Sequence, residues 1–212
     1  MNTRLGLRGH RVQNSERAEA RRRDILVAAA RVFARDGYAA ASLDDIGEQL
    51  GVSKGVIYYY FRSKEAIYTE IATTASREAS QRLETIVAQG DPPDVALRAA
   101  ISNLVSHIFD DLDRYSITMR TGERLSPESL ALIRAQGRRY EQLLRGIIVD
   151  GIRAGLFVDH DPTLTTFTIL RACLGIADWY SPNGRLTPQA IVQQVTEQMI
   201  GGVLRRPEAP LN

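Results

Sequence analysis

The chain has 212 residues, of which 44% are hydrophobic and 25% are charged, close to the average of folded globular proteins. This composition excludes a largely disordered or collagen-like chain, and no apolar run reaches the ~18 residues that span a membrane. The single cysteine, Cys173, excludes an internal disulfide and is typical of the reducing cytoplasm. We therefore expect a cytoplasmic protein with no membrane partner.

Positive charge is concentrated near the N-terminus. Residues 1–64 carry 12 basic and 7 acidic side chains, a net charge of +5, whereas the remainder carries 15 basic and 18 acidic side chains, a net charge of −3. The first 23 residues hold seven arginines and no apolar stretch, which excludes a secretory signal peptide. The imbalance suggests that the N-terminal third contacts a polyanion, although charge alone favours the alternative of a solvated charged surface.

Residues 1–14 show no hydrophobic period and are predicted to form a flexible basic arm. Its arginines can contact phosphates or the minor groove of DNA, or the arm can be a tail without a partner. The arginines concerned are Arg4, Arg8 and Arg11, with Arg17 just beyond them. From Ser15 onward, helical spacing of apolar residues predicts a helix that ends at Gly37.

Two short helices follow. Ser42 opens a capping-box pattern before the first of them, and Gly51 ends it. Ser53 is placed to cap the second, which runs to about Tyr60. Two short helices joined by a turn of about three residues are typical of a helix-turn-helix unit.

The rest of the chain reads as helix after helix. Four helix starts are predicted where a capping residue precedes a proline: Asp91-Pro92, Ser126-Pro127, Asp161-Pro162 and Thr187-Pro188. The fold class is therefore all-α, with about nine helices in two parts. The predicted organisation is an arm at 1–14, a helix-turn-helix DNA-binding domain at 15–62, an effector-binding and dimerisation domain at 63–206, and a tail at 207–212.

The last two helices are candidates for a dimer interface. Residues 163–181 are apolar nearly all round, and the final helix carries one apolar stripe. Together they can form a two-fold homodimer, with a purely intramolecular core as the alternative. The predicted interface residues are Leu174, Ile191, Val192, Val195, Met199 and Val203.

The stretch from Ser42 to Lys64, SLDDIGEQLGVSKGVIYYYFRSK, resembles the TetR family of bacterial repressors, whose pattern includes G-V-S-x-G-x-I-Y-x-x-F-x-S-K. Ile25-Leu26, Ala29-Ala30, Phe33 and Gly37-Tyr38 also match the first helix of that family, so the resemblance covers about residues 20–70. It implies a repressor that binds a pseudo-palindromic double-stranded DNA operator as a homodimer and is released by a small effector bound in the second domain.

Helix-turn-helix geometry assigns the candidate DNA contacts. The second helix of such a unit enters the major groove with its N-terminal residues at the base edges, and here these are Ser53, Lys54 and Gly55. Lys54 can donate to guanine O6 and N7. Phosphate or sugar contacts are expected from Tyr58, Tyr59 and Lys64, and the resemblance adds Ser42.

Other residues of the unit carry different expectations. Ile57, Phe61 and one of Tyr58 or Tyr60 are expected to pack in the core. The acidic pair Asp44-Asp45 departs from the basic or neutral residues often found there, and would repel phosphate unless turned away.

Two other functions are considered. Gly51-Val52-Ser53-Lys54-Gly55 matches the G-x-S-x-G nucleophile elbow of serine hydrolases, but a helix is predicted where the elbow needs a strand. The histidines His10, His107 and His160 lack a recognisable triad pattern, so no enzyme is expected. The second alternative is a ligand-independent DNA-binding protein whose second domain only dimerises.

No metal or cofactor is expected. Asp159-His160-Asp161 contains ligand-type residues, but three adjacent residues cannot converge on one ion, and Asp161 is better placed as a helix cap. Cys173 lies in an apolar helix and is expected to be an inert buried thiol.

The effector class follows from a second resemblance. The segment from Trp179 to Pro188 looks like the W-Y-x-P-x-G-R-L-S-P turn of a TetR subgroup that includes repressors of fatty-acid and sterol-side-chain breakdown, which respond to acyl-CoA thioesters. Candidate ligand residues are polar or aromatic positions within apolar helices: His107, Tyr115, Met119, Arg120, Tyr140, Arg171 and Trp179. Arg171 suits a carboxylate, phosphate or thioester; a salt bridge with Asp178 or Glu141 is the alternative.

Overall fold

The computed structural model describes the backbone of residues 5–120 and 125–204, with the side chains of 16–117 and 125–204. Within these ranges the predicted all-α class is confirmed, and the only β-type pairing is an isolated bridge between Phe157 and Leu204. None of the described helices is long and apolar enough to cross a membrane. The helices are α1 (Leu5–Asp36), α2 (Leu43–Leu50), α3 (Lys54–Tyr60), α4 (Lys64–Ala88), α5 (Pro93–Asp110), α6 (Leu112–Arg120), α7 (Pro127–Arg153), α8 (Pro162–Leu174), α9 (Ile176–Trp179) and α10 (Pro188–Val203).

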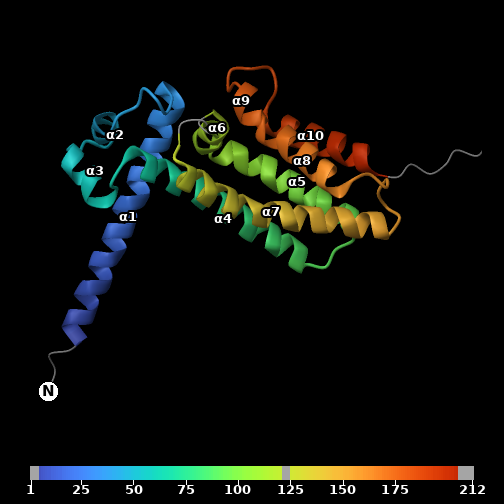
Figure 1. The fold of residues 1–212 in the computed structure, drawn as a ribbon, viewed down its shortest axis with the longest axis horizontal. Helices are drawn as coiled ribbons and strands as arrows, with labels where there is room; N and C mark the ends of the chain where they lie inside the picture. The colour runs from blue at the N-terminus through green and yellow to red at the C-terminus, as the bar shows by residue number, and fades with distance from the viewer. Residues whose placement is uncertain (1–4, 121–124, 205–212) are drawn as a thin grey trace, which may run out of the picture.

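The helices form two parts (Figure 1). We call α1–α3 the head and α4–α10 the body. Helix α4 begins at the head and runs alongside α7 through the body, where α5, α8 and α10 complete the bundle (Figure 1). The single turn α9 follows α8 directly after Gly175, so these two segments occupy most of the one helix predicted over 163–181.

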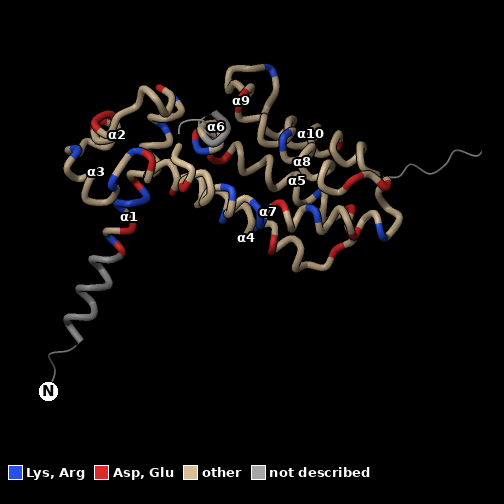
Figure 2. Tube along the Cα trace, viewed as in Figure 1, with Lys and Arg blue, Asp and Glu red and all other residues tan. Residues whose placement is uncertain are grey.

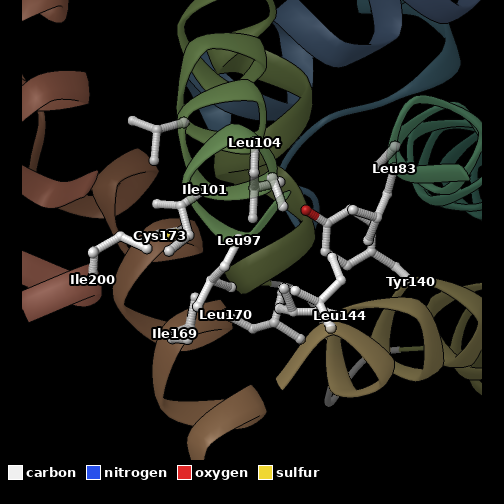
Figure 3. Packing of buried hydrophobic residues seen from close by; sticks show 14 of the residues in the cluster. Leu83, Leu97, Ile101, Leu104, Tyr140, Leu144, Ile169, Leu170, Cys173 and Ile200 are labelled. Carbon is white, nitrogen blue, oxygen red and sulfur yellow. The ribbon is translucent and has the colours of Figure 1, made fainter. Parts of the chain in front are cut away.

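Two hydrophobic clusters stabilise the two parts, and α4 contributes to both. Ile67, Tyr68 and Ile71 of α4 pack in the head cluster, whereas Ala79 and Leu83 pack in the body cluster. The body cluster also buries Cys173 completely, as predicted, and burial raises the pKa of its thiol to about 12 (Figure 3). Helix α4 therefore packs in both parts of the molecule.

Proline-marked helix starts are found as predicted at α7, α8 and α10. The side chains of Ser126, Asp161 and Thr187 each accept a hydrogen bond from the backbone N–H three residues later. The prediction for α5 is one residue early, because that helix starts at Pro93 with Pro92 as its N-cap. A residue before proline is disfavoured in helical conformation, and Pro92 accordingly has an extended ψ of 146°.

The start of α1 differs from the sequence prediction. Residues 5–14, predicted as part of a flexible arm, are helical, because they contain no proline and lead without a break into the strong helix formers of residues 16–23. Arg4 lies outside the described residues, and the side chains of Arg8 and Arg11 lie outside the described side chains. A contact of these arginines with DNA stays a prediction.

The apolar stripe of α10 is divided between two environments. Ile191 and Val203, predicted at a dimer interface, are instead buried in the body cluster of their own chain, because this face of α10 packs on α5. Val192, Val195 and Met199 are only partly buried against the same cluster, and Leu174 of α8 is likewise partly buried. Burial within one chain supports the intramolecular alternative for Ile191 and Val203.

Apolar side chains of α8 point away from that cluster. Leu164 is 67% exposed and Phe167 is 43% exposed, although both lie on the helix predicted to be covered on two sides. The opposite face of α8 is buried through Ile169, Leu170 and Cys173. One face of α8 is therefore covered within the chain, and its other face presents apolar surface to the outside.

Candidate DNA-binding surface and effector cavity

A capping box and two glycines define the backbone of the helix-turn-helix unit. The Ser42 hydroxyl accepts from the Asp45 N–H at 3.2 Å while the Asp45 carboxylate accepts from the Ser42 N–H at 2.7 Å, which completes the predicted capping box. Gly51 has a φ of +66°, a conformation that disfavours other residues. A Cβ at Gly47 would lie 2.7 Å from the Val52 carbonyl oxygen, so glycine permits the close turn.

Helix α3 separates core residues from exposed ones. Ile57 and the following Phe61 are buried, as predicted, and Tyr60 packs against the head cluster as the second aromatic core residue. Tyr58 is 52% exposed and Tyr59 is 81% exposed. The remaining predicted base-reading residues, Ser53, Lys54 and Gly55, are also exposed, and the Ser53 hydroxyl makes no capping hydrogen bond.

Lys54 has an acidic partner within the unit. Its Nζ lies 2.7 Å from the Asp44 carboxylate and 6.0 Å from the centre of the Tyr58 ring. The ion pair raises the pKa of Lys54, and both side chains are exposed. Figure 2 shows the acidic start of α2 and the basic start of α3 at the same end of the molecule. Both acidic side chains therefore have partners within the unit: Asp45 completes the capping box, and Asp44 forms an ion pair with Lys54.

Lys64 has a structural environment that the sequence does not predict. Its Nζ donates to the carbonyl oxygens of Tyr38, Ala39 and Ala41 at 2.6, 3.2 and 2.7 Å. The ammonium also lies 4.7 Å from the centre of the Tyr38 ring. These contacts hold the loop before α2 against the start of α4, and they direct the ammonium protons into the protein rather than toward a phosphate.

One ion pair links the head to the body, and two hydrogen-bonded contacts fix the start of α4 within the body. Arg22 of α1 pairs through two nitrogens with the Glu70 carboxylate on α4, and its third nitrogen donates to the Tyr60 carbonyl at 2.9 Å. The Glu65 carboxylate accepts from the Ser126 N–H at 2.8 Å, and hydrogen bonds with the side chains of Ser126 and Ser129, together with this backbone bond, lower the pKa of Glu65. The Tyr68 hydroxyl also donates to the Ile117 carbonyl of α6 at 3.0 Å.

A cavity of about 160 Å³ lies inside the body between α4, α5, α7 and α8. Small side chains on α4 and a glycine on α7 leave this space, and two tyrosines line it. Its lining residues are Ala72, Ala75, Ser76, Ala79, Leu104, Tyr115, Ile133, Gly137, Tyr140, Glu141, Leu170 and Leu174. The wall is mostly apolar with a few polar groups, as in small-molecule sites.

A polar cluster lies beside the cavity. His107 Nδ1 is 3.4 Å from the Asp110 carboxylate, yet burial and the nearby Arg82 lower the pKa of the imidazole. Arg114 pairs with Glu78 and Asp111, at 2.8 and 2.7 Å. The Nε of Arg82 is buried and has no hydrogen-bond partner among the described residues.

The structure brings together only part of the predicted ligand set. Tyr115 and Tyr140 line the cavity, and His107 lies near it. Arg171 and Trp179 are exposed on α8 and α9 instead, because the opposite face of these helices forms the body core. Met119 and Arg120 belong to α6, but their side chains lie outside the described ones.

Comparison with known proteins covers both parts of the chain. Residues 25–71 match the family described as "Bacterial regulatory proteins, tetR family", and residues 90–203 match "Tetracyclin repressor-like, C-terminal domain". The chain belongs to the TetR family. It is therefore a DNA-binding transcriptional regulator and not an enzyme.

Relatives of this TetR-family chain match it over most of their length. The repressor KstR2 of Rhodococcus jostii is 25% identical over 189 residues, 86% of this chain and 91% of the relative. The structure of PfmR from Thermus thermophilus is 28% identical with a TM-score of 0.77, covering 85% of this chain and 99% of that one. AibR, solved with isovaleryl coenzyme A and operator DNA, is 25% identical with a TM-score of 0.76, covering 87% and 98%.

The hydrolase alternative also fails on the geometry of the TetR-family unit. Ser53 follows helix α2 and its turn, and it occupies the N-cap of α3. A nucleophile elbow instead requires a strand directly before the serine. At the other candidate site, Asp161 caps α8 by accepting from the Leu164 N–H at 2.7 Å, as predicted.

Sequence reasoning missed the small residues that create the cavity of this TetR-family protein. Ala72, Ala75 and Ala79 recur at helical spacing on one face of α4, and Gly137 faces them from α7. That spacing was a usable signal, because small side chains in an otherwise well-filled core leave space. Arg22 and Glu70 were also missed, since a pair separated by 48 residues leaves no local pattern.

Proposed function

We propose that this TetR-family protein is a homodimeric repressor that binds a pseudo-palindromic operator through α3 and leaves it when a small hydrophobic effector, such as an acyl-CoA, occupies the body cavity. One observation carries the DNA-binding part: the N-terminal end of α3 presents Ser53, Lys54 and Gly55 together, all exposed. Because Ile57 and Phe61 fix the opposite face of this segment in the head core, α3 is presented rigidly to a major groove.

The exposed aromatic residues extend that surface. Tyr58 and Tyr59 follow the base-reading end of α3, and their hydroxyls can reach phosphates beside the groove. Ser42 lies at the start of α2, where its neighbouring N–H groups can meet a phosphate even though its hydroxyl serves the capping box. Lys64 is assigned a structural role in place of a phosphate contact, because its ammonium is held by three carbonyls.

The exposed apolar face of α8 supports a dimer. Leu164 and Phe167 are exposed apolar side chains of α8, and Leu164 lines a groove of about 210 Å³ with Met199 and Gly202 of α10. A two-fold axis through this face would place residue i of one protomer against its copy. The interface proposed here thus keeps α8 and Met199 and omits the buried Ile191 and Val203.

Effector release requires a mechanical connection, and α4 supplies it. The cavity touches α4 at Ala72 and Ala75, while the same helix holds the head through Lys64 and Glu70. An effector that favours one position of α4 would bias the spacing of the two α3 helices. A hundredfold change in operator affinity needs about 2.7 kcal/mol of such coupling. The cavity favours this function over a ligand-independent protein, in which the second domain only dimerises.

Selection of bound genomic fragments followed by DNase footprinting tests the proposal. We expect one protected region containing two inverted half-sites whose centres are separated by about one helical turn or a multiple of it. Lys54→Ala should bind the selected site less selectively, and the surface variant Lys54→Arg serves as a charge-preserving control. Enrichment of no fragment, or protection of a site without two-fold symmetry, would contradict a dimeric operator-binding protein.

A further inference from the structure

The cavity of the body is small for a ligand site. Its volume of about 160 Å³ is close to that of an engineered apolar cavity of ~150 Å³ that holds one benzene molecule, whereas drug-sized ligands occupy ~300 Å³ or more. It therefore has room for roughly six non-hydrogen atoms. On the sides formed by α5 and α8, Leu104 and Leu170 line the cavity, and both are buried in the body cluster.

Tyr140 places a polar atom in this apolar space. The residue is 8% exposed and lines the cavity, and Figure 3 shows its hydroxyl directed away from α7 toward Leu104. No side-chain hydrogen bond joins this hydroxyl to another residue in the described part of the chain, and the residue lines the cavity, so the hydroxyl is available to a bound molecule. Burial raises the pKa of Tyr140 far above its usual range, so the phenol keeps its proton and can donate it.

We propose that this cavity binds a short acyl group of roughly six non-hydrogen atoms, whose carbonyl oxygen accepts a hydrogen bond from the Tyr140 hydroxyl. The inference rests on the proposed function and specifies its effector class: butanoyl-, branched pentanoyl- or hexanoyl-sized acyl groups, in place of long fatty chains or sterol rings. The acyl group can come from a coenzyme A thioester or from the free acid, because the cavity contacts only the part that both share.

Packing around the site explains the size limit. The methyl groups of Ala72, Ala75 and Ala79 form the α4 wall, so these residues have no rotamers that could open more space. A longer chain that runs deeper into the body would have to displace Leu104 or Leu170 from a core packed at the density of protein interiors. The acyl group that fits would touch α4 directly, which places it on the helix that carries the head.

Calorimetric titration of the full-length protein with a series of thioesters tests the size limit. The probes are the acetyl, butanoyl, 3-methylbutanoyl, hexanoyl, decanoyl and hexadecanoyl thioesters of coenzyme A, each repeated with the free acid. We expect the affinity to peak between butanoyl and hexanoyl and to fall at least tenfold at decanoyl. Tightest binding of the decanoyl or hexadecanoyl probe would overturn the size limit.

Tyr140→Phe tests the hydrogen bond. We expect this substitution to lower the affinity for the tightest-binding probe roughly five- to tenfold, because one buried hydrogen bond is lost with little change in shape. Tyr180→Phe is the matched control, because Tyr180 packs on Phe109 outside the cavity. Removing the Tyr180 hydroxyl should therefore leave the affinity for the probe unchanged. Equal affinities of Tyr140→Phe and the unaltered protein would overturn the role of the hydroxyl.

Filling the cavity provides a variant that should fold. Gly137→Leu introduces bulk from α7 where an added Cβ meets only the Glu141 carboxylate, at 4.0 Å, and it also removes a helix-destabilising glycine. Binding of the best probe should fall at least tenfold, whereas Gly146→Leu, on an open part of the same helix, should leave it unchanged. Unchanged binding by Gly137→Leu would place the ligand elsewhere.

Failure of this inference is distinguishable from failure of the proposed function. If long-chain probes bind best and release DNA, the effector-released repressor stands and the short-acyl site is wrong. If no probe binds at any length while the protein still protects its operator, both the short-acyl site and the acyl-CoA effector are wrong, and the DNA-binding function stands.

Discussion

The ammonium of Lys54 lies 2.7 Å from the Asp44 carboxylate at the tip of the head. This pair joins the start of α3 to the first turn of α2, so the cation that points toward the DNA is balanced by an anion of the same unit. Both side chains are exposed, so the pair itself adds little to folding stability. The pair matters for DNA binding, because Lys54 must break its ion pair with Asp44 before it can contact a base or a phosphate.

Removing the acidic partner should strengthen DNA binding. In Asp44→Asn, Lys54 no longer exchanges one anion for another, so we expect affinity for any duplex to rise and the salt slope of binding to steepen by up to about one unit. The double variant Asp44→Asn with Lys54→Ala should lose this gain, and fluorescence anisotropy at several salt concentrations measures both. Equal affinities of Asp44→Asn and the unaltered protein would show that the pair does not compete with DNA.

Lys64 should matter for folding more than for DNA. Lys64→Met loses three charge-assisted hydrogen bonds to the loop of residues 38–41, and we expect the free energy of unfolding to fall by about 2 kcal/mol. Lys54→Met is the control, because its ion pair is exposed and its loss should leave stability nearly unchanged. Urea denaturation measures both, and a stable Lys64→Met whose salt slope drops by one unit would instead make Lys64 a phosphate contact.

The exposed face of α8 should control the oligomeric state. Phe167→Glu places a charge in the centre of the proposed interface, so we expect light scattering to report half the mass of the unaltered protein. Leu132→Glu provides the matched control, since Leu132 is also an exposed apolar side chain, 58% exposed, but lies on α7. A dimer of unchanged mass for Phe167→Glu would place the interface elsewhere.

His107 should make stability depend on pH near neutrality. Burial lowers the pKa of its imidazole in the folded state below the ordinary value of about 6.5, so the unfolded chain binds the proton more readily. The folded state is therefore favoured above that value and loses stability as the pH falls through it. Denaturation between about pH 7.5 and pH 5.5 should show a smaller decline for His107→Gln than for the unaltered protein. An identical decline in His107→Gln and the unaltered protein would show that His107 does not carry the effect.

The head is the part that the sequence predicts best. Local patterns determine it: the Ser42 capping box, the Gly51 stop and the burial of Ile57 and Phe61 all follow from short-range spacing. Lys64 shows the limit of this reasoning. Its type and position suit a phosphate contact, but the carbonyls of residues 38–41, more than 20 residues earlier, decide where its ammonium points.

The body is predicted in class but not in detail. Helix periodicity places Ile191 and Val195 on one stripe of α10, yet tertiary packing buries the first and leaves the second at the boundary. Arg171 likewise lies in an apolar helix, and only the packing of the opposite face of α8 shows that it is exposed. Which apolar side of a helix faces the core depends on neighbours distant in sequence.

A gel shift on DNA flanking the protein's own gene tests the central claim most directly. The labelled fragment is titrated with protein, and the retarded complex is then challenged with the acyl thioester that binds most tightly and with coenzyme A alone. We expect a retarded band that the thioester removes and coenzyme A does not, with Gly137→Leu retaining the band in both cases. A band that persists in the unaltered protein at saturating thioester would contradict effector-released repression.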